Sequence, residues 1–401
     1  MKERLKSITK RLHRDRLTAT AEHLLRDEAI SGKLILVAVA VALLVANTPL
    51  FPFYDAFLHT DLRLGFNGWE IAFDIKHWIG EGLMVFFFLV VGLELKRELV
   101  RGELRDRRKA ILPVAAAVGG MVLPALIFLA INMGRETSGG WAIPTATDIA
   151  LAVGILTLAG KHIPSSVRIF LLALAIVDDI LAVMVIALFF NNGLEPLILA
   201  AMFVIGLQAY LLGKRGLLPM WGFVFVGIVM WLLAIQSGVH PSIIGVVLGF
   251  MAPMASHRNP GEQIAERAER AMIPFSTLFV VPIFAFANTG LNFNSGPIDL
   301  ETAVPLGGGI IAGLVLGKAL GVLGMTWLMV KTGIADLPHR ARWSHIAGVG
   351  VLAGIGFTVA IFVTDLAFTN EQYILISKLG IFIASAFTAV VGLAILRFAK
   401  H

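Results

Sequence analysis

The stretch Leu171-Leu-Ala-Leu-Ala-Ile-Val-Asp-Asp-Ile-Leu-Ala-Val-Met184 sets two adjacent aspartates in the middle of an apolar segment. That segment extends over 166–191, which is long enough for a helix that crosses a lipid bilayer. Inserting an ionised side chain at such depth costs about 2.5–3.5 kcal/mol, so its presence favours a functional role. Neighbours on a helix point about 100° apart, so Asp178 and Asp179 can line two walls of one cavity.

Two close carboxylates in a medium of low dielectric constant do not both ionise readily. Such a pair binds either protons or a hard cation, which carboxylate oxygens suit. Competition for one site is the simplest chemistry of exchange. A structural ion pair with Lys318 is the alternative, although two aspartates exceed the charge that one lysine neutralises.

The whole chain is too apolar for a water-soluble protein. Of its 401 residues, 57% are hydrophobic and 15% are charged, and the mean hydropathy is +0.84. Soluble domains are about half apolar and about a quarter charged. The composition therefore predicts a membrane protein, and the lack of cysteine excludes disulfides, cysteine-based zinc sites and thiolate catalysis.

Apolar runs near the length of a membrane span recur along the chain, and we count twelve. The seventh and the eighth are separated only by Ser237-Gly238, so the count depends on a break there. The expected helices lie at 32–48, 77–96, 111–132, 141–160, 166–191, 195–212, 217–236, 240–256, 270–290, 303–331, 343–368 and 372–398.

Positive charge is distributed unevenly between the segments that join these helices. With the N-terminus in the cytoplasm, the inner segments hold 28 of the 33 lysines and arginines, and the outer segments hold only Arg63, Lys76 and Arg135. Cytoplasmic loops carry such an excess, so both termini are expected inside. This placement also accounts for the net charge of +6 without a nucleic-acid partner.

Residues 1–31 are expected to form a basic cytoplasmic tail, with an amphipathic helix on the membrane surface. A signal peptide is the alternative, because Leu34–Ala46 is apolar and Asn-Thr-Pro follows it. Its polar leader would be unusually long, and a second hydrophobic helix follows soon after. We therefore expect residues 32–398 to form a single transmembrane domain.

Two of the expected helices contain residues that interrupt a helix. Pro144 removes a helical hydrogen bond shortly before Asp148, and Thr145 and Thr147 offer hydroxyl groups to the freed backbone. Four glycines within 348–356 weaken a second helix. A plain kink and close helix packing are the alternatives at these two places. The bare ends of an interrupted helix survive in lipid only beside a cavity with compensating charges, for which Asp148 and Lys318 are suited.

These two breaks occupy matching positions in the chain. Each lies in the middle helix of three, one within 111–191 and the other within 303–398. Such a match indicates an inverted repeat with its site at the membrane midplane. We therefore expect an all-α polytopic membrane protein, with two inverted three-helix repeats whose interrupted helices cross and with interface helices at 32–100 and 195–290.

One outer loop alternates between apolar and polar residues. Residues 62–73 do so around Asn67-Gly68, which is a strong signal for a small external β-hairpin. A lone hairpin is marginally stable in water. This one is expected to pair with its twin in a homodimer or to rest on its own helices.

Six stretches carry a family signature: Phe87-Phe-Leu-Val-Val-Gly-Leu-Glu-Leu-Lys-Arg-Glu-Leu99, Gly140-Trp-Ala-Ile-Pro-Thr-Ala-Thr-Asp-Ile-Ala150, Ala173-Leu-Ala-Ile-Val-Asp-Asp179, Ser237-Gly-Val-His240, Leu278 to Asn288, and Gly354-Ile-Gly-Phe-Thr358. They resemble the NhaA-type sodium/proton antiporters, and the resemblance covers residues 30–398. Inverted repeats are a known feature of this family, so the repeat pattern is not independent support.

The resemblance implies a transporter rather than an enzyme. Such antiporters are electrogenic and expel sodium, and lithium as well, in exchange for about two protons per ion. The resemblance makes Asp179 the principal sodium ligand, pairs Asp178 with Lys318, and places Thr147 and Asp148 at the helix crossing. It further implies a bacterial inner-membrane location, a homodimer, and no cofactor besides the transported ions.

The resemblance also places a pH response at a cytoplasmic funnel, which Glu94, Glu98 and Glu269 match here. A Glu-Leu-Lys-Arg-Glu run at a helix end is equally typical of a solvated, salt-bridged cap. Some members have histidines near the last position, where this chain has Arg270 and Ile273. Arginine does not titrate near neutrality, so we expect a shifted pH profile.

His240, near an outer helix end, is a further candidate for the pH response, although a satisfied interfacial histidine is the simpler interpretation. Two other functions fit broken membrane helices. A sodium-coupled solute symporter would need a roomier, amphipathic cavity, and a sensor or scaffold would have no use for aspartates at the midplane. The sequence has no nucleotide-binding P-loop, so the proton gradient is expected to drive transport.

Overall fold

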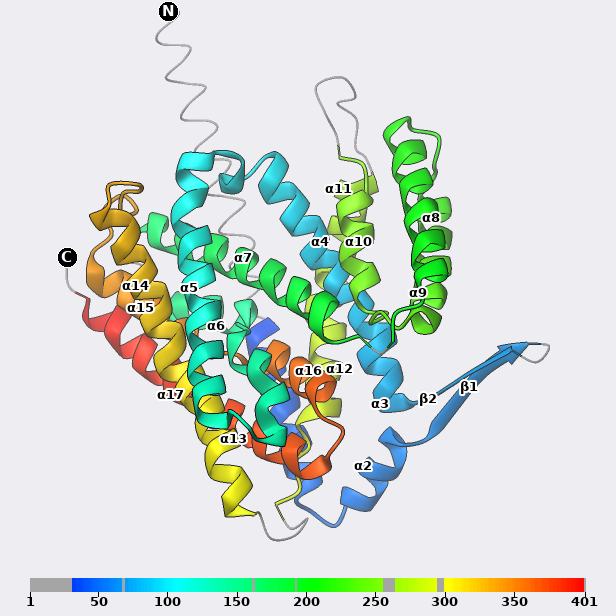
Figure 1. Cartoon of the computed structure of the whole chain (residues 1–401), viewed down its shortest axis with the longest axis horizontal. Helices are drawn as coiled ribbons and strands as arrows, with labels where there is room; N and C mark the ends of the chain where they lie inside the picture. Colours follow the sequence, from blue (N-terminus) through cyan, green and yellow to red (C-terminus); the bar gives the residue numbers. More distant parts are fainter. Residues whose placement is uncertain are drawn as a thin grey trace, which may run out of the picture.

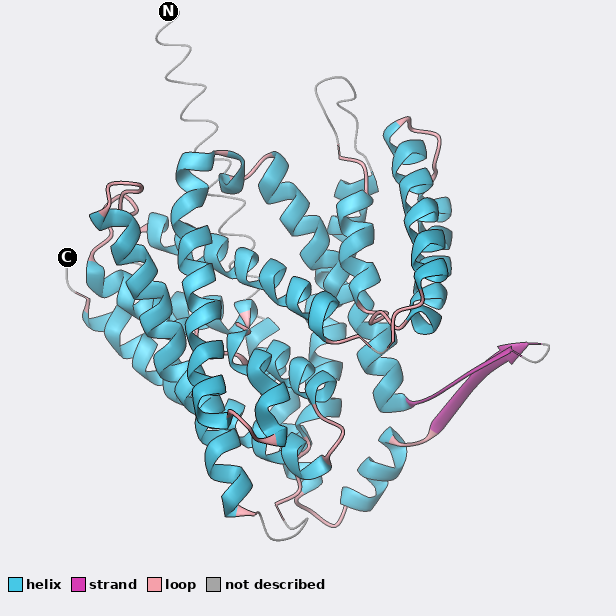
Figure 2. Cartoon of the chain, in the orientation of Figure 1, coloured by secondary structure: helices cyan, strands magenta, loops and turns pink. Residues whose placement is uncertain are grey.

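The described part of the chain consists of helices and one two-stranded sheet (Figure 2). The computed structural model describes residues 31–66, 69–160, 163–191, 193–254, 264–293 and 299–399. The predicted basic tail, residues 1–31, lies outside these ranges except for Ser31.

The elements follow one another along the chain in the order in which Figure 1 colours them. They are the helix Ser31–Ala46, α2 (Phe51–Leu58), β1 (Asp61–Phe66), β2 (Trp69–Asp74), α3 (Ile75–His77), η1 (Trp78–Leu83), α4 (Met84–Val100), η2 (Glu103–Arg105), α5 (Arg107–Asn132), η3 (Glu136–Thr145), α6 (Ile149–Ala159), α7 (Ser165–Phe189), α8 (Pro196–Lys214), α9 (Met220–Ser237), α10 (Ile243–Met251), α11 (Ile264–Phe275), η4 (Ser276–Val280), α12 (Val281–Thr289), α13 (Leu300–Ala312), η5 (Gly313–Gly317), α14 (Lys318–Lys331), α15 (Trp343–Leu352), α16 (Phe357–Ala367) and α17 (Glu371–Phe398).

Many of these helices are long and apolar enough to cross a membrane. Among the described residues, eight qualify singly, and the number rises to eleven if each of three bent pairs is one span. The chain is therefore a multi-pass membrane protein, as its composition predicts. The bent pairs are Ser31–Ala46 with Phe51–Leu58 (115°), Glu136–Thr145 with Ile149–Ala159 (44°), and Trp343–Leu352 with Phe357–Ala367 (43°).

The break between the seventh and eighth predicted helices is present. Gly238 ends α9 with φ of 78°, a left-handed conformation that side chains disfavour. The helix that follows, predicted over 240–256, is only the nine residues of α10. A helix of that length rises about 13 Å and does not cross a bilayer alone. The count of twelve spans stays a prediction.

Both predicted helix interruptions are present as well. The first leaves residues 146–148 between η3 and α6, and the second leaves residues 353–356 between α15 and α16. Each bent pair is the middle member of its block, between α5 and α7 in one case and between the continuous helix Leu300–Lys331 and α17 in the other. The inverted relation of the two blocks stays a prediction that these matched breaks support.

The first long helices of the two blocks, α5 and α14, pack against each other through glycine (Figure 1). A Cβ atom at Gly119 would collide with the Gly321 carbonyl oxygen, and one at Gly321 would collide with that of Gly119. In a membrane, small residues of this kind let helix backbones approach closely. The contact fixes α14 next to α5 and so positions Lys318, which lies one turn before Gly321.

Two apolar clusters meet at the level of the helix breaks. Along α7, one cluster includes residues from Val167 to Val177, and the other includes residues from Val183 to Ile186. Asp178 and Asp179 lie between them. The breaks also lie at this boundary, because Leu352 and Phe357 belong to the first cluster and Val359 to the second.

The predicted hairpin is present. Strands β1 and β2 pair antiparallel with Phe66 opposite Trp69, and the ribbon projects from the body of the molecule (Figure 1). Its predicted turn, Asn67-Gly68, lies outside the described residues. Leu62 and Leu64 are exposed on β1, whereas Ile71 on β2 is buried.

Candidate functional site

The two interrupted helices cross and bond to each other through their unwound segments. The backbone N–H of Asp148 donates to the carbonyl oxygen of Ile355 at 2.6 Å. The Thr147 hydroxyl donates to the carbonyl oxygen of Ala353 at 2.7 Å. Polar backbone groups that an interrupted helix would leave unsatisfied in lipid therefore find partners in the other interruption.

The Asp148 carboxylate lies where two helices begin. It accepts a hydrogen bond from the Leu151 N–H at 3.0 Å and so caps α6. Its other oxygen accepts from the Thr358 N–H at 3.1 Å and from the Thr358 hydroxyl at 2.5 Å, at the start of α16. Helix N-termini carry partial positive charge, so one buried carboxylate stabilises both ends.

Asp178 forms a buried ion pair with Lys318. The Lys318 Nζ lies 2.6 Å from the Asp178 Oδ2, and both side chains are 1% exposed. The two residues belong to α7 and α14, which lie in different blocks of the chain. A buried charge pair of this kind is strongly destabilised when one partner is removed, because the other charge is left without compensation.

The surroundings of the Asp179 carboxylate differ from those of Asp178. It is 7% exposed, and within the described ranges no group donates a hydrogen bond to its carboxylate. Its electrostatic neighbours are mostly negative: Asp178, Glu94 and Asp148, against the single cation Lys318. A carboxylate in such surroundings attracts a proton or a small cation strongly.

The acidic groups predicted to respond to pH gather at the C-terminal end of α4. Arg97 is bonded to Glu269 of α11, and its Nε lies 4.0 Å from Glu98. Glu94 interacts electrostatically with this group and with Asp179. The structure thus places Glu94 between the aspartates and the ionic cluster of Arg97, Glu98 and Glu269.

His240 lies apart from both groups. Its Nδ1 is 2.8 Å from the Oε1 of Glu81, close enough for an ion pair, although no hydrogen bond is aligned there. Glu81 precedes Glu94 by thirteen residues along η1 and α4, which is about 20 Å of helix. The structure therefore does not bring His240 to the other candidates.

Two buried charged residues, Glu81 and Lys378, and the half-buried partner of Lys378, Asp365, escape the sequence reasoning. Glu81 is one of them, at 7% exposed. The other two are Asp365 of α16 and Lys378 of α17, which form a second ion pair with 2.8 Å between Oδ1 and Nζ. All three lie within about two turns of a helix end, where a charge is usually taken to reach the membrane surface. The lone lysine inside the otherwise apolar segment 372–398 is the signal that could have found the second pair.

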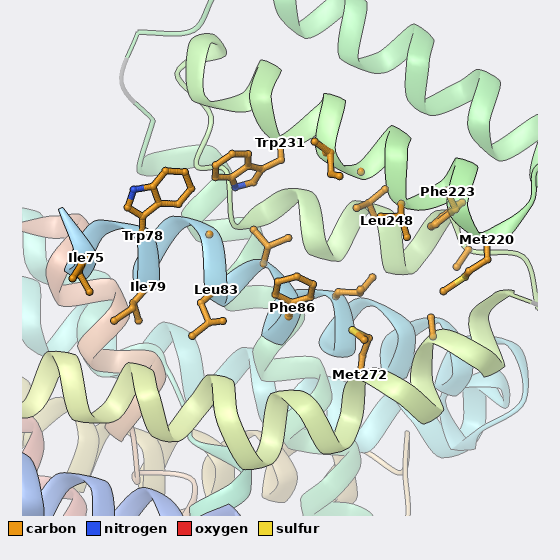
Figure 3. A pocket seen from close by; sticks show the side chains of 18 residues that line it. Ile75, Trp78, Ile79, Leu83, Phe86, Met220, Phe223, Trp231, Leu248 and Met272 are labelled. Carbon is orange, nitrogen blue, oxygen red and sulfur yellow. The ribbon is translucent and has the colours of Figure 1, made fainter. Parts of the chain in front are cut away.

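A large apolar pocket lies away from these groups. It has a volume of about 660 Å³ and opens between η1, α4, α9 and α11. Apolar side chains line it, with Trp78 and Trp231 stacked at one end (Figure 3). None of the three aspartates borders it, so it suits hydrocarbon rather than an ion. In the described residues, no group of three or more His, Asp or Glu side chains forms a ready metal cage.

Comparison with known proteins adds to this geometry. The family described as Na+/H+ antiporter 1 matches residues 22–396. The Na+/H+ antiporter NhaA of Aliivibrio fischeri (strain MJ11) is 43% identical over 373 residues, which cover 92% of this chain and 95% of the relative. The NhaA 1 of Clostridium beijerinckii is 40% identical over 376 residues and 94% of each chain.

A solved structure has a related fold. The sodium proton antiporter MjNhaP1 from Methanocaldococcus jannaschii aligns with a TM-score of 0.55, and the alignment covers 95% of this chain and 99% of that one. The sequence identity is 14%, so this likeness concerns the fold alone.

Proposed function

The chain belongs to the Na+/H+ antiporter 1 family, and from that membership we propose that it expels sodium ions in exchange for protons across a bacterial cell membrane. It is a transporter and not an enzyme. The single observation that carries the proposal is the contrast between two adjacent buried aspartates: Asp178 is paired with Lys318, and Asp179 has no hydrogen-bond donor among the described residues.

We propose that the two aspartates bind either sodium or protons. Facing the cytoplasm, the carboxylates lose protons as the pH rises, and a sodium ion takes their place on Asp179. The negative neighbours of Asp179 favour any cation there, so the ion and the proton compete for the same oxygens. Facing outward, protons displace the sodium ion.

The change of access requires one part of the molecule to move against the other. We propose that the blocks 111–191 and 303–398 move together, because α5 and α14 interlock at glycine and the two interrupted helices bond to each other. The helices of 32–100 and 195–290 would form the stationary part. One bound cation is thereby exposed to the two sides in turn.

The stoichiometry, the acceptance of lithium and the pH response are expected to follow from the same binding scheme. Each of the two carboxylates takes one proton when sodium leaves, so exchange of about two protons per sodium ion moves net charge. Lithium is expected to replace sodium, since it is also a small hard cation. The cluster of Arg97, Glu98 and Glu269 would set the pH at which exchange begins.

We propose further that the protein is a homodimer in the inner membrane with both termini in the cytoplasm. The hairpin supports the dimer, because Leu62 and Leu64 are exposed on β1. A second copy would cover them and extend the sheet. The excess of lysine and arginine in alternate connecting segments supports the placement of the termini.

Fluorescence of a pH-sensitive dye in everted membrane vesicles tests the proposed exchange. Respiration first acidifies the vesicle interior and quenches the dye, and a salt is then added. Sodium or lithium should restore the fluorescence at alkaline pH, whereas potassium or choline should not. If sodium restores no fluorescence at any pH, although the chain is present in the membrane, the proposal is wrong.

A further inference from the structure

The second ion pair, half-buried Asp365 with buried Lys378, lies on the hairpin side of the crossing. Lys378 is 2% exposed, and its Nζ is 2.8 Å from the Asp365 Oδ1. Lys378 also interacts electrostatically with Lys76, which follows the hairpin. The Asp365 side chain is 24% exposed, whereas that of Lys378 is 3% exposed.

Asp365 shares one face of α16 with the residues that reach the ion site. Thr358, Phe362 and Asp365 follow one another at spacings of four and three, which is one side of a helix over two turns. Thr358 holds Asp148 at the crossing. Asp365 therefore lies about 10 Å further along the same face.

Phe362 lies on α16 between Thr358, which binds the Asp148 carboxylate, and Asp365. It is buried, and its ring lies 5.4 Å from that of Phe88, 6.0 Å from that of Phe284 and 6.3 Å from that of His240. Those three residues belong to α4, α12 and the turn before α10, all outside the two repeat blocks. Aromatic rings thus pack around α16 between the crossing and Asp365, and Asp365 lies just beyond them.

The Asp365–Lys378 pair leaves part of the carboxylate unused. The buried Oδ1 has no aligned hydrogen bond despite its short distance to Nζ. A carboxylate has about four lone-pair positions, so Asp365 retains free acceptor capacity. Removal of a neighbouring cation would leave the carboxylate open to another hard cation.

We propose that Asp365 is a cation-binding residue on the outer route, where a sodium or lithium ion rests between the midplane aspartates and the external solution. Lys378 neutralises Asp365 when no ion is there and competes with the ion for it. This assignment rests on the proposed exchange function and adds to it a site with a defined side of access. The alternative is a pair that only holds α16 against α17.

The test compares the two faces of the membrane in the same cells. Right-side-out vesicles present the outer face to the medium, and everted vesicles present the inner face. The quantity measured is the sodium concentration that gives half-maximal exchange from each face. Asp365→Asn should raise it about fivefold to tenfold from the outer face, the size of one ionic contact in a partly hydrated site, and leave it unchanged from the inner face.

Two further variants separate binding from packing. Lys378→Gln frees the carboxylate and should lower the half-maximal concentration from the outer face. The double variant Asp365→Asn with Lys378→Gln contains no unpaired charge, so a purely structural pair predicts recovery of the wild-type value. A cation site predicts that the outer value stays raised. Glu371→Gln, which removes an exposed carboxylate at the start of α17, is the matched control and should change nothing.

The inference is overturned if Asp365→Asn changes the half-maximal sodium concentration equally from both faces or from neither. It is also overturned if the double variant has the wild-type value from the outer face. If Asp365→Asn is absent from the membrane, the double variant replaces it. Its half-maximal sodium concentration from the outer face then decides between a cation site and a structural pair. Failure of the exchange function itself looks different, because the wild-type protein would then show no sodium-dependent exchange from either face.

Discussion

The charged residues at the helix crossing and those at the end of α4 form two groups that differ in burial and in the cations that neutralise their carboxylates. At the helix crossing, Asp148, Asp178 and Asp179 outnumber Lys318, and all four are buried. At the end of α4, Arg97 and Arg101 are bonded to Glu269 and Glu266, and the arginines are 24% and 44% exposed. The first group has a deficit of positive charge that an ion or protons can fill. The second has fixed cations and partial contact with water.

The difference indicates which group can exchange sodium ions for protons and which can adjust the pH dependence of that exchange. An excess of buried carboxylates binds any small cation that reaches it, whereas arginine stays charged at every accessible pH and holds its carboxylates in place. Substitutions in the first group should therefore abolish transport, and those in the second should shift its pH dependence.

The largest expected effect is at the paired aspartates. Asp178→Asn and Asp179→Asn should each reduce sodium-dependent dye dequenching in everted vesicles at least about a hundredfold, because neither amide can hold a proton or replace a carboxylate toward a hard cation. Asp55→Asn, at an exposed position of α2, is the control and should retain wild-type exchange. Full exchange in either midplane variant would refute the assignment.

A smaller but still large effect is expected at Asp148. Asp148→Ala leaves the Thr358 hydroxyl and two helix N-termini without a carboxylate, so we expect a loss of about 2–4 kcal/mol of stability. A thermal melt of the purified protein measures it, and exchange should fall about tenfold or more. Asp299→Ala removes the cap of α13 at an exposed end and is the matched control. Equal melts for the two variants would contradict the special position of Asp148.

The glycine contact between α5 and α14 is the next test. Gly321→Ala adds a Cβ that collides with the Gly119 carbonyl oxygen, so α14 must shift together with Lys318. We expect a loss of about 1–3 kcal/mol in the thermal melt and a weaker apparent affinity for sodium. Gly324→Ala, on the same helix with open space at its Cβ, should behave as wild type. If neither alanine variant lowers the stability in the thermal melt or the apparent affinity for sodium, the glycine contact does not position α14 as proposed.

The smallest effect belongs to the cluster at the end of α4. Arg97→Gln removes the cation that Glu269 and Glu98 share, and a carboxylate without that neighbour keeps its proton to a higher pH. The onset of exchange should move upward by about half a pH unit or more, with a maximal rate within about twofold of wild type. Arg215→Gln, at the exposed end of α8 and outside this cluster, is the control and should leave the onset unchanged. A lower maximum with an unchanged onset would show that the cluster is structural.

The sequence predicts the elements of the fold well, because each has a local cause. The apolar runs, the interruption after Pro144, the glycines near 348–356 and the alternation around Asn67-Gly68 all carry their signal within a few residues. The predicted end of the helix at 256 overlooks a local signal of the same kind. Pro253 follows Met251, the last residue of α10, by two positions and disfavours a helical conformation at Ala252. The Nζ of Lys96 donates to the carbonyl oxygens of Phe250 and Ala252 that this end leaves free, a contact with no local signal.

The candidate site is predictable in its members but not in its contacts. An aspartate in an apolar helix stands out, so Asp148, Asp178, Asp179 and Lys318 are found from the sequence. Physical reasoning from the residues does not decide which aspartate Lys318 binds, and the family resemblance suggests Asp178. Asp365 and Lys378 are missed because charges near helix ends are common, and only the fold brings them together as an ion pair.

The most direct test of the account is the apparent sodium affinity of exchange by the purified protein in sealed lipid vesicles, measured as a function of pH. If sodium and protons compete for the same carboxylates, the concentration of sodium that half-saturates exchange should rise about tenfold or more for each unit by which the pH falls below the titration of the site, while the maximal rate at saturating sodium changes little. A half-saturating concentration that stays constant with pH, with only the maximal rate changing, would contradict shared binding by Asp178 and Asp179.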